Sequence, residues 1–504
     1  MLFNSYVFIF LYLPVVLVVF QLLSRLGLKA ALNWLTCASM VFYGYWNVAY
    51  VGLLLASIGF NYLMARAIHG ARTSRADERY ARLLLAIAVL GNLSVLGYFK
   101  YRGFVLENLG AVTGWIHAPE VIVLPLGISF FTFTQIAFLV DTYRWGLPGY
   151  PFLRYALFVS YFPHLIAGPI LHHRQFLPQL EERERMAFSY SHLAVGLTIF
   201  SIGLFKKIVL ADGMSAYADP VFFAAYRGFQ ITFMEAWVGA LAYTLQLYFD
   251  FSGYSDMAIG LSWLFGLRLP ENFASPYKAT SIIEFWRRWH ITLSRFLRDY
   301  LYIPLGGNRE GAGRTYINLL VTAVLGGLWH GAGWTFVLWG GIHGIYLVVN
   351  HAWRRLRGPN ARPGLTYRAA WKWLAWTLTF GAVVAGWVVF RSATVKSAWT
   401  MIRGMLGMNG FSPPRQWEPW LNSISWSLGI AWIVVLLVIV VALPNTQQVM
   451  ARFLPRDDAV AGSADSREPM VWRPNGRWAA CVGIMLACSI LYLHRTSQFL
   501  YFQF

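Results

Sequence analysis

Long apolar runs recur along this chain, and short loops that carry most of its charge separate them. The clearest runs lie near residues 6–23, 31–47, 49–65, 83–99, 121–140, 192–211, 231–249, 372–391, 426–443 and 478–494. A helix needs about 20 apolar residues to cross a bilayer core of about 30 Å. Only 12% of the residues are charged, against roughly 25% in soluble domains. The pattern predicts an all-α, polytopic membrane protein that forms one domain over residues 1–504, with about 11–12 crossings.

The basic residues are concentrated in short loops between the apolar runs. Arginines at 66, 72, 75, 79 and 82 follow the third run, and another basic loop begins at Arg354. Lysine and arginine enrichment of this kind marks cytoplasmic loops of multi-pass proteins. The formal net charge of +19 therefore indicates contact with the bilayer and with an anionic ligand, and we expect no nucleic-acid partner.

One apolar segment does not have the pattern of a straight crossing. Residues 154–170 contain Pro163, Gly168 and Pro169. Irregular backbone at membrane depth is tolerated only where protein or a water-filled cavity surrounds it. We expect a re-entrant or interfacial segment here.

The most informative stretch begins at Ser281. Ser281 and Glu284 fit a capping box, and Pro304 would end the helix that follows. Aromatic and aliphatic residues fall on one face of this predicted helix, and four arginines lie on the other: Arg287, Arg288, Arg295 and Arg298. We expect it to lie along the cytoplasmic interface. His290 borders the apolar face, either turned towards a site or simply buried between helices.

His330 lies in a second part of this stretch, in the sequence GGLWHGAGW. The basic flanks at Arg314 and Arg354 both indicate the cytoplasmic side, so the chain should enter the membrane and return near His330. An ionisable residue at that depth is a functional candidate by default. The alternative is a histidine that only forms a hydrogen bond between helices. His343, farther along, is expected to have a packing or supporting role.

No known catalytic or metal-binding motif is present. There is no serine-histidine-acid spacing, G-x-S-x-G or phosphate-binding loop. His172 and His173 are adjacent, and H-E-x-x-H spacing is absent, so we predict no metal site. A neutral buried histidine is a competent general base. We therefore expect direct transfer, in which a histidine deprotonates an acceptor that attacks a bound donor.

Polar residues near the end of another span suggest supporting roles. Asp250 and Asp256 need partners in an apolar setting. Arg287, Arg288 or Arg298 are expected to form a structural ion pair with them, and direct catalysis is the alternative. Asn272 and Tyr277, in the loop before the arginine-rich helix, are expected to line a polar pocket, although a simple turn explains them equally well.

Several longer words of the sequence resemble the membrane-bound O-acyltransferases, and within them the alginate O-acetyltransferase type. They are LPLGISFFTFTQ (124–135), DTYR (141–144), FPHLIAGPI (162–170), YFDFSGYSDMAIG (248–260), EFWRRWHITLSRFLRDYLYIPLGGNR (284–309) and GGLWHGAGWTFVLWGGIHG (326–344). The resemblance implies a helical bundle around a tunnel through the membrane, with a core over about 120–350 and further helices over 370–504.

The resemblance also implies a reaction. His330 is the expected catalytic residue and His290 the second functional histidine. Acetyl-CoA is the expected donor, entering from the cytoplasm, with no permanently bound cofactor. The acceptor would be an exopolysaccharide of alginate or cellulose type, reached through a periplasmic or membrane-anchored partner. Arg287, Arg288 and Arg298, with Asn272 and Tyr277, are expected to bind the donor.

Two other functions fit the same sequence. One is a transport or export component of a polysaccharide secretion system, which broken helices and intramembrane polar residues would suit. The other is an acyltransferase of the same family with another acceptor, such as teichoic acid. Transport leaves the two histidines in glycine- and tryptophan-rich surroundings unexplained.

Overall fold

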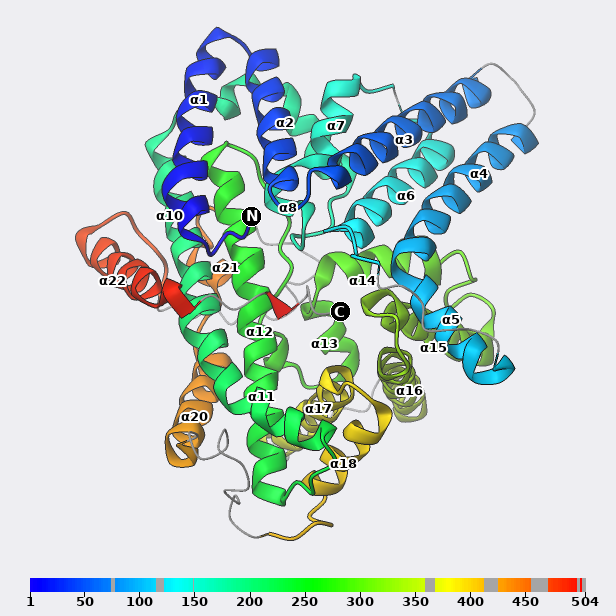
Figure 1. Ribbon diagram of the computed structural model, residues 1–504, viewed down its shortest axis with the longest axis vertical. Coiled ribbons are helices and arrows are strands. Elements are labelled where there is room, and N and C mark those ends of the chain that lie inside the picture. Colours follow the sequence, from blue (N-terminus) through cyan, green and yellow to red (C-terminus); the bar gives the residue numbers. More distant parts are fainter. Residues whose placement is uncertain are drawn as a thin grey trace. The chain divides into compact units, whose positions relative to one another are not determined.

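The computed structural model describes residues 1–73, 78–114, 122–147, 149–358, 368–411, 425–454, 470–495 and 499–500. Within these ranges the chain forms helices and connecting loops, and no strand (Figure 1). The predicted all-α fold is therefore confirmed. Most of the predicted basic loop after Arg354, most of the polar segment between 451 and 473, and the last four residues lie outside the described residues.

The chain divides into two compact units, of which the first holds residues 1–204, 254–270 and 493–496. Helix α4 packs against both α3 and α6, and α2 packs against α1 and α7. The helices of this unit are η1 (Phe8–Tyr12), α1 (Leu13–Leu26), α2 (Leu28–Gly44), α3 (Ala49–Thr73), α4 (Glu78–Leu96), η2 (Gly97–Tyr101), α5 (Arg102–Thr113), α6 (Ile128–Trp145), α7 (Phe152–Ser160), α8 (Phe162–Leu165), α9 (His173–Phe176), η3 (Leu177–Glu181), η4 (Arg183–Met186), α10 (Tyr190–Phe205), which ends at the boundary, and η9 (Leu493–Arg495).

The predicted interruption of the 154–170 segment is present. Helix α7 ends at Ser160, and the four-residue α8 follows it after Tyr161. A Cβ atom at Gly168 would lie 2.4 Å from the Cα of His164, so the backbone folds back closely on itself here. This segment is too irregular to cross a membrane as one helix.

The second unit holds residues 205–253, 271–492 and 497–504. Its helices are η5 (Lys206–Ala211), α11 (Asp212–Tyr226), α12 (Phe233–Leu264), which continues into the first unit, η6 (Pro276–Lys278), α13 (Ile282–Arg288), α14 (Ile291–Leu297), η7 (Arg298–Tyr302), α15 (Gly311–His330), α16 (Trp334–Arg357), α17 (Arg368–Arg391), α18 (Val395–Met405), α20 (Trp426–Ala442), α21 (Thr446–Val449) and α22 (Gly476–Tyr492).

Helices α15 and α16 form a close hairpin whose turn follows His330. Glycines on facing surfaces permit the contact, because a Cβ atom at Gly327 would lie 2.3 Å from the carbonyl oxygen of Phe336. A Cβ atom at Gly340 would lie 2.5 Å from the carbonyl oxygen of Ala323. Small residues allow helix backbones in membranes to approach closely. The predicted return of the chain near His330 is therefore confirmed.

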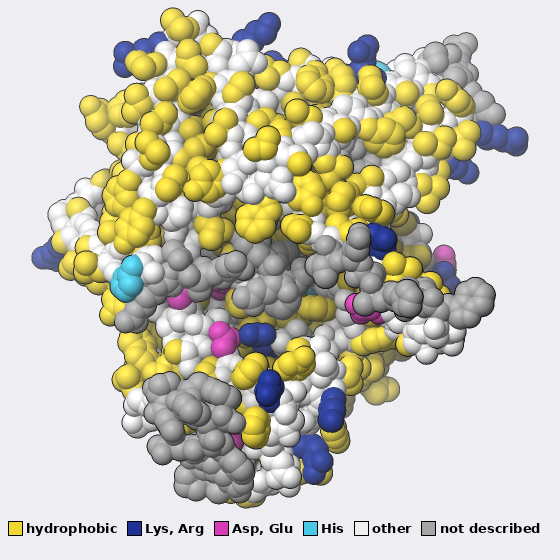
Figure 2. Space-filling view, viewed as in Figure 1, with side chains coloured by type: hydrophobic (Ala, Val, Ile, Leu, Met, Phe, Trp, Pro, Cys, Tyr) yellow, Lys and Arg dark blue, Asp and Glu magenta, His cyan; other side chains and the backbone are white. Residues whose placement is uncertain are grey.

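Apolar side chains are exposed over much of the face that Figure 2 shows, and basic side chains occupy a few separate places on it. Within the described residues, five helices are long and apolar enough to cross a membrane: Phe8–Leu26, Ala49–Thr73, Glu78–Thr113, Tyr190–Tyr226 and Ala369–Arg391. Helices α20 and α22 are apolar but shorter. A multi-pass membrane protein follows, and the larger number of crossings stays a prediction.

Candidate active site

The sequence predicts one amphipathic helix from Ser281 to about residue 303, and that prediction is wrong. Ser281 does cap a helix, since its hydroxyl accepts a hydrogen bond from the backbone N–H of Glu284. The helix ends at Arg288, however, and α14 begins at Ile291. Between them His290 has φ 42°, in the left-handed region that few residues other than glycine adopt.

The preceding loop holds this break in place. The backbone N–H of Ala274 donates to the carbonyl oxygen of Arg288 at 2.9 Å, and that of Ile291 donates to the carbonyl oxygen of Asn272 at 3.0 Å. These bonds satisfy backbone groups at the interruption, as buried backbone requires. The apolar face that the sequence predicts is buried against protein: Phe285, Trp289 and Leu293 are all inaccessible.

Asn272 determines which nitrogen of His290 carries the proton. Its Oδ1 accepts hydrogen bonds from the backbone N–H of Thr292 at 3.3 Å and from the Thr292 hydroxyl at 3.0 Å. The same oxygen lies 3.2 Å from Nδ1 of His290. Because a backbone N–H can only donate, the side chain of Asn272 presents its oxygen here, and Nδ1 of His290 must donate too. The neutral ring therefore has its lone pair on Nε2.

The environment keeps His290 uncharged. The side chain is fully buried, and its Nε2 has no hydrogen-bond partner among the described residues. Burial lowers the pKa of His290 to about 3, because a charged ring would lose its hydration. A neutral imidazole with an available lone pair can accept a hydrogen bond from a substrate.

His330 is the last residue of α15, and Gly331 after it is extended. The side chain is buried and lies among aromatic rings, with centroids 5.2 Å from Trp339 and 5.4 Å from Phe390. Its ring centroid is 6.3 Å from that of His290. Two histidines separated by 40 positions in the chain thus meet in the interior of the second unit.

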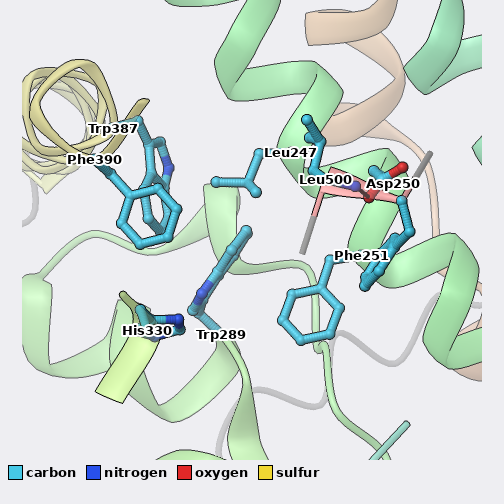
Figure 3. Close-up of a pocket in the computed structure, with 9 residues that line it drawn as sticks. Leu247, Asp250, Phe251, Trp289, His330, Trp387, Phe390 and Leu500 are labelled. Atoms are coloured by element: carbon cyan, nitrogen blue, oxygen red, sulfur yellow. Dashed lines mark hydrogen bonds between the residues drawn. The ribbon is translucent and has the colours of Figure 1, made fainter. Parts of the chain in front are cut away.

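A cavity opens beside His330 (Figure 3). Helix α17 contributes Trp387 and Phe390, which the sequence does not single out, because aromatic residues in an apolar span have no distinguishing pattern. The complete lining is Leu247, Asp250, Phe251, Trp289, His330, Trp387, Phe390, Phe499 and Leu500. An apolar, aromatic wall with one histidine and one carboxylate suits a small acyl group.

Asp250 pairs with a lysine and not with the arginines that the sequence suggests. Its Oδ1 lies 2.7 Å from Nζ of Lys207, and that Nζ lies 2.7 Å from Oδ1 of Asp212. The other oxygen of Asp250 accepts a hydrogen bond from the backbone N–H of Leu500 at 3.2 Å. Lys207 lies on η5, a π-helical segment, a feature frequent at functional sites. One buried lysine therefore forms ion pairs with two carboxylates here.

The residues predicted to bind the donor occupy different environments. Arg287 is exposed, Arg298 lies against Asp299 at 2.7 Å, and Arg288 lies against Glu284 at 2.8 Å. Tyr277 is buried, and its hydroxyl donates to the carbonyl oxygen of Thr244. Asn272 contacts His290, as described above. Contact of any of these residues with a donor stays a prediction.

His343 has the packing environment expected for it. The buried ring lies 5.0 Å from Trp339 and 5.3 Å from Trp286, measured between centroids. A Cβ atom at Gly386 would lie 2.6 Å from its Nε2. His343 thus fills the aromatic interior behind His330.

A helical membrane protein with a buried histidine in the wall of an aromatic cavity, and a second buried histidine next to it, has the characteristics of a membrane acyltransferase. The model of the membrane-bound O-acyltransferase family matches residues 131–384, and the chain belongs to this family.

Individual relatives agree with this assignment. The chain is 44% identical to the peptidoglycan O-acetyltransferase of Helicobacter pylori over 82% of its own length and 81% of the relative. It is 40% identical to the probable alginate O-acetylase AlgI of Azotobacter vinelandii over the full length of both. A more distant relative is the teichoic acid D-alanyltransferase of Streptococcus thermophilus, 28% identical over 53% of this chain and 68% of the relative.

Proposed function

We propose that this protein transfers acetyl groups from cytoplasmic acetyl-CoA across the inner membrane for O-acetylation of an exopolysaccharide, of alginate or cellulose type. The observation that carries the proposal is that His330 lines an aromatic cavity and that the ring of His290 lies 6.3 Å from it, measured between centroids. The full-length similarity to the probable alginate O-acetylase supports the acetyl group and the polysaccharide class.

His330 is the general base in this mechanism. It takes the proton of the acceptor hydroxyl as the hydroxyl oxygen attacks the thioester carbonyl of acetyl-CoA. A carbon–oxygen bond forms, the carbon–sulfur bond breaks, and the proton passes from the imidazolium to the departing thiolate. General-base catalysis of this kind contributes roughly 10²–10⁴-fold to a rate.

His290 positions a substrate and does not itself change charge. Its Nε2 lone pair, fixed by the hydrogen bond from Nδ1 to Asn272, accepts a hydrogen bond from a neighbouring hydroxyl of the polysaccharide. This bond aligns the attacking hydroxyl, whose proton goes to His330, with the thioester. Alignment of reacting groups is a large part of the acceleration when the donor is already activated. The exposed guanidinium of Arg287 and its neighbours Arg288 and Arg298 attract the phosphates of CoA.

A periplasmic or membrane-anchored acetyltransferase receives the acetyl group or presents the polysaccharide. Export without chemistry and acylation of another acceptor, such as teichoic acid, are the alternatives that the experiment must separate.

The test is acetyl transfer by the purified protein in liposomes, with labelled acetyl-CoA outside and the polysaccharide with its partner inside. We expect labelled ester with the wild type and a loss of about 10²-fold or more with His330→Ala. His290→Asn keeps a residue that tolerates the left-handed backbone and should lower the rate while leaving its pH dependence unchanged. His192→Gln, a half-buried histidine outside this cavity, is the matched control.

Three outcomes would contradict the proposal. Acetyl transfer by His330→Ala at the wild-type rate would exclude His330 as the general base. Labelled ester on an added teichoic acid and not on the polysaccharide would change the acceptor. Passage of polysaccharide across the membrane without any ester formed would indicate transport.

A further inference from the structure

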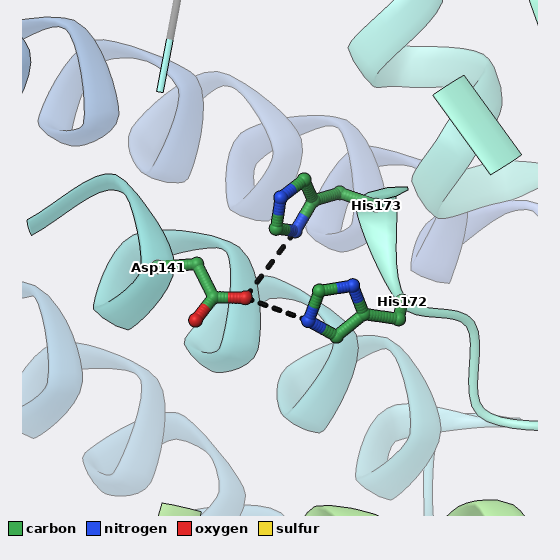
Figure 4. A group of neighbouring side chains, drawn as sticks. All are labelled: Asp141, His172 and His173. Atoms are coloured by element: carbon green, nitrogen blue, oxygen red, sulfur yellow. Dashed lines mark ion pairs between the residues drawn. The ribbon is translucent and has the colours of Figure 1, made fainter. Parts of the chain in front are cut away.

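A second group of chemically active side chains lies in the first unit. Asp141, in the last turn of α6, meets His172 and His173 at the start of α9 (Figure 4). Oδ2 of Asp141 is 2.8 Å from Nε2 of His172 and 3.4 Å from Nδ1 of His173. One ligand atom from each residue can be chosen so that all three lie within 4.8 Å of one another. The acetyl-transfer mechanism uses none of these residues.

His173 is the member that a simple ion pair does not explain. The side chain is 1% exposed, and neither ring nitrogen has a hydrogen-bond partner among the described residues. An uncompensated polar group in the interior is costly. Its Nδ1 nevertheless points at the carboxylate of Asp141, at a distance that is close but lacks hydrogen-bond geometry.

We propose that Asp141, His172 and His173 form a binding site for a divalent transition-metal ion, with Zn²⁺ as the ion that their chemistry favours. Imidazole is a borderline ligand that Zn²⁺ binds and that Mg²⁺ and Ca²⁺ disfavour, and Zn²⁺ also accepts a carboxylate as a third ligand. Three protein ligands leave a fourth position for water, as in other open zinc sites.

Two of the three separations between ligand atoms are close to those that such a site needs. Ligands at about 2.0–2.1 Å from a tetrahedral zinc lie about 3.3 Å from one another. The 3.4 Å distance between Oδ2 of Asp141 and Nδ1 of His173 matches this value. The 2.8 Å contact of Asp141 with His172 is that of a hydrogen bond, and it must lengthen by about 0.5 Å when the metal replaces the proton.

Metal binding has one local cost. Nδ1 of His172 accepts a hydrogen bond from the backbone N–H of Arg174 at 3.3 Å, which places the ring proton on Nε2. Ligation through Nε2 moves that proton to Nδ1 and gives up this bond. Its length marks it as weak, so the metal–ligand bonds exceed the loss.

An ion can reach this site, and its binding would have a mechanical effect. The side chain of His172 is 33% exposed, whereas Asp141 and His173 are buried behind it. A bound ion would join the end of α6 to the chain that follows the broken segment α7–α8. The site therefore stabilises the irregular part of the first unit.

The test uses full-length protein, purified in detergent with an affinity tag that contains no histidine. Metal content after dialysis against Zn²⁺ is measured by mass spectrometry, and Co²⁺ is titrated in as a spectroscopic probe. We expect about one ion per chain, visible absorption bands of tetrahedral Co²⁺, and a rise in melting temperature with Zn²⁺. Asp141→Asn and His173→Gln should weaken binding at least about 10-fold, while His192→Gln should bind as the wild type does.

Folding of each variant is checked by size-exclusion chromatography, and His172→Gln, at the more exposed position, provides a second variant if His173→Gln does not fold. Absence of Co²⁺ bands in folded wild-type protein would overturn the proposal. Undiminished binding by folded His172→Gln or His173→Gln would equally overturn it, because the ion would then lie elsewhere. Neither result bears on acetyl transfer.

Discussion

The hydrogen bonds of Asn272 lead to a prediction that distinguishes a role in positioning the ring of His290 from a role in folding alone. Replacement of Asn272 by leucine keeps the approximate side-chain volume and removes the oxygen that accepts from His290 and Thr292. The ring of His290 then loses the bond that fixes both its orientation and its tautomer. We expect folded Asn272→Leu protein to transfer acetyl more slowly, with the ring no longer held against the acceptor.

The expected loss of stability follows from counting the hydrogen-bond donors that lose their acceptor in this variant. The Thr292 hydroxyl can rotate to another acceptor, but the backbone N–H of Thr292 and the ring N–H of His290 stay buried and lose their acceptor. Each buried unsatisfied donor costs about 1–3 kcal/mol, so the variant should lose about 2–6 kcal/mol of stability. Misplacement of a reacting group by about 1 Å can cost about 10²-fold in rate, and we expect a loss of roughly 10- to 100-fold.

The assay measures the single-turnover rate of acetyl transfer per folded molecule, together with the melting temperature. Asn272→Asp retains an acceptor for all three donors and should recover much of the rate. Asn92→Leu is the matched control, because it removes a buried amide that pairs reciprocally with Asn61 in the first unit. It should lose stability without losing rate. Wild-type transfer by folded Asn272→Leu would refute the positioning role.

Two further predictions concern stability. Gly327→Ala should destabilise the protein by about 1–3 kcal/mol through overpacking, because its Cβ would lie 2.3 Å from the carbonyl oxygen of Phe336. A thermal melt should show this as a lower melting temperature. Gly341→Ala is the control and should be close to neutral, because a Cβ there would lie 4.0 Å from Cγ2 of Val324. Burial lowers the pKa of His290 to about 3, whereas an unfolded histidine titrates near about 6.5. The unfolded chain therefore binds the proton first as pH falls, and the stability present above pH 6.5 declines by about 2 kcal/mol by pH 5. The melting temperature of His290→Asn should depend less on pH than that of the wild type. An equal dependence would contradict the inference that His290 is neutral and buried in the folded protein.

Sequence patterns predicted the elements whose determinants are local. The hairpin turn at His330 was predictable because glycines and basic flanks mark it within about 40 residues. The break before α8 was predictable from Pro163 and its neighbouring glycine and proline. In both cases the residues that cause the structure are part of the segment that adopts it.

The errors concern residues whose partners are distant in the chain. The apolar periodicity continues through Trp289 and Leu293, so it predicts an unbroken helix, whereas the hydrogen bonds that hold the break come from the loop at Asn272 and Ala274. The partner of Asp250 is Lys207, which lies more than 40 residues earlier in the sequence.

The cluster at His173 also joins residues that are distant in the chain. Its carboxylate comes from Asp141, on another helix. Periodicity and motif spacing contain no information about such pairings, and the prediction of no metal site, which depended on spacing alone, stays untested.

The backbone conformation of His290 affects how mutations at this position are interpreted. A left-handed residue with a Cβ atom costs about 1–2 kcal/mol relative to glycine, so an alanine variant removes the imidazole and keeps the strain. A glycine variant removes both. The difference between these two variants measures the free energy stored in the peptide backbone at φ 42°, and the deficit that they share measures the contribution of the ring.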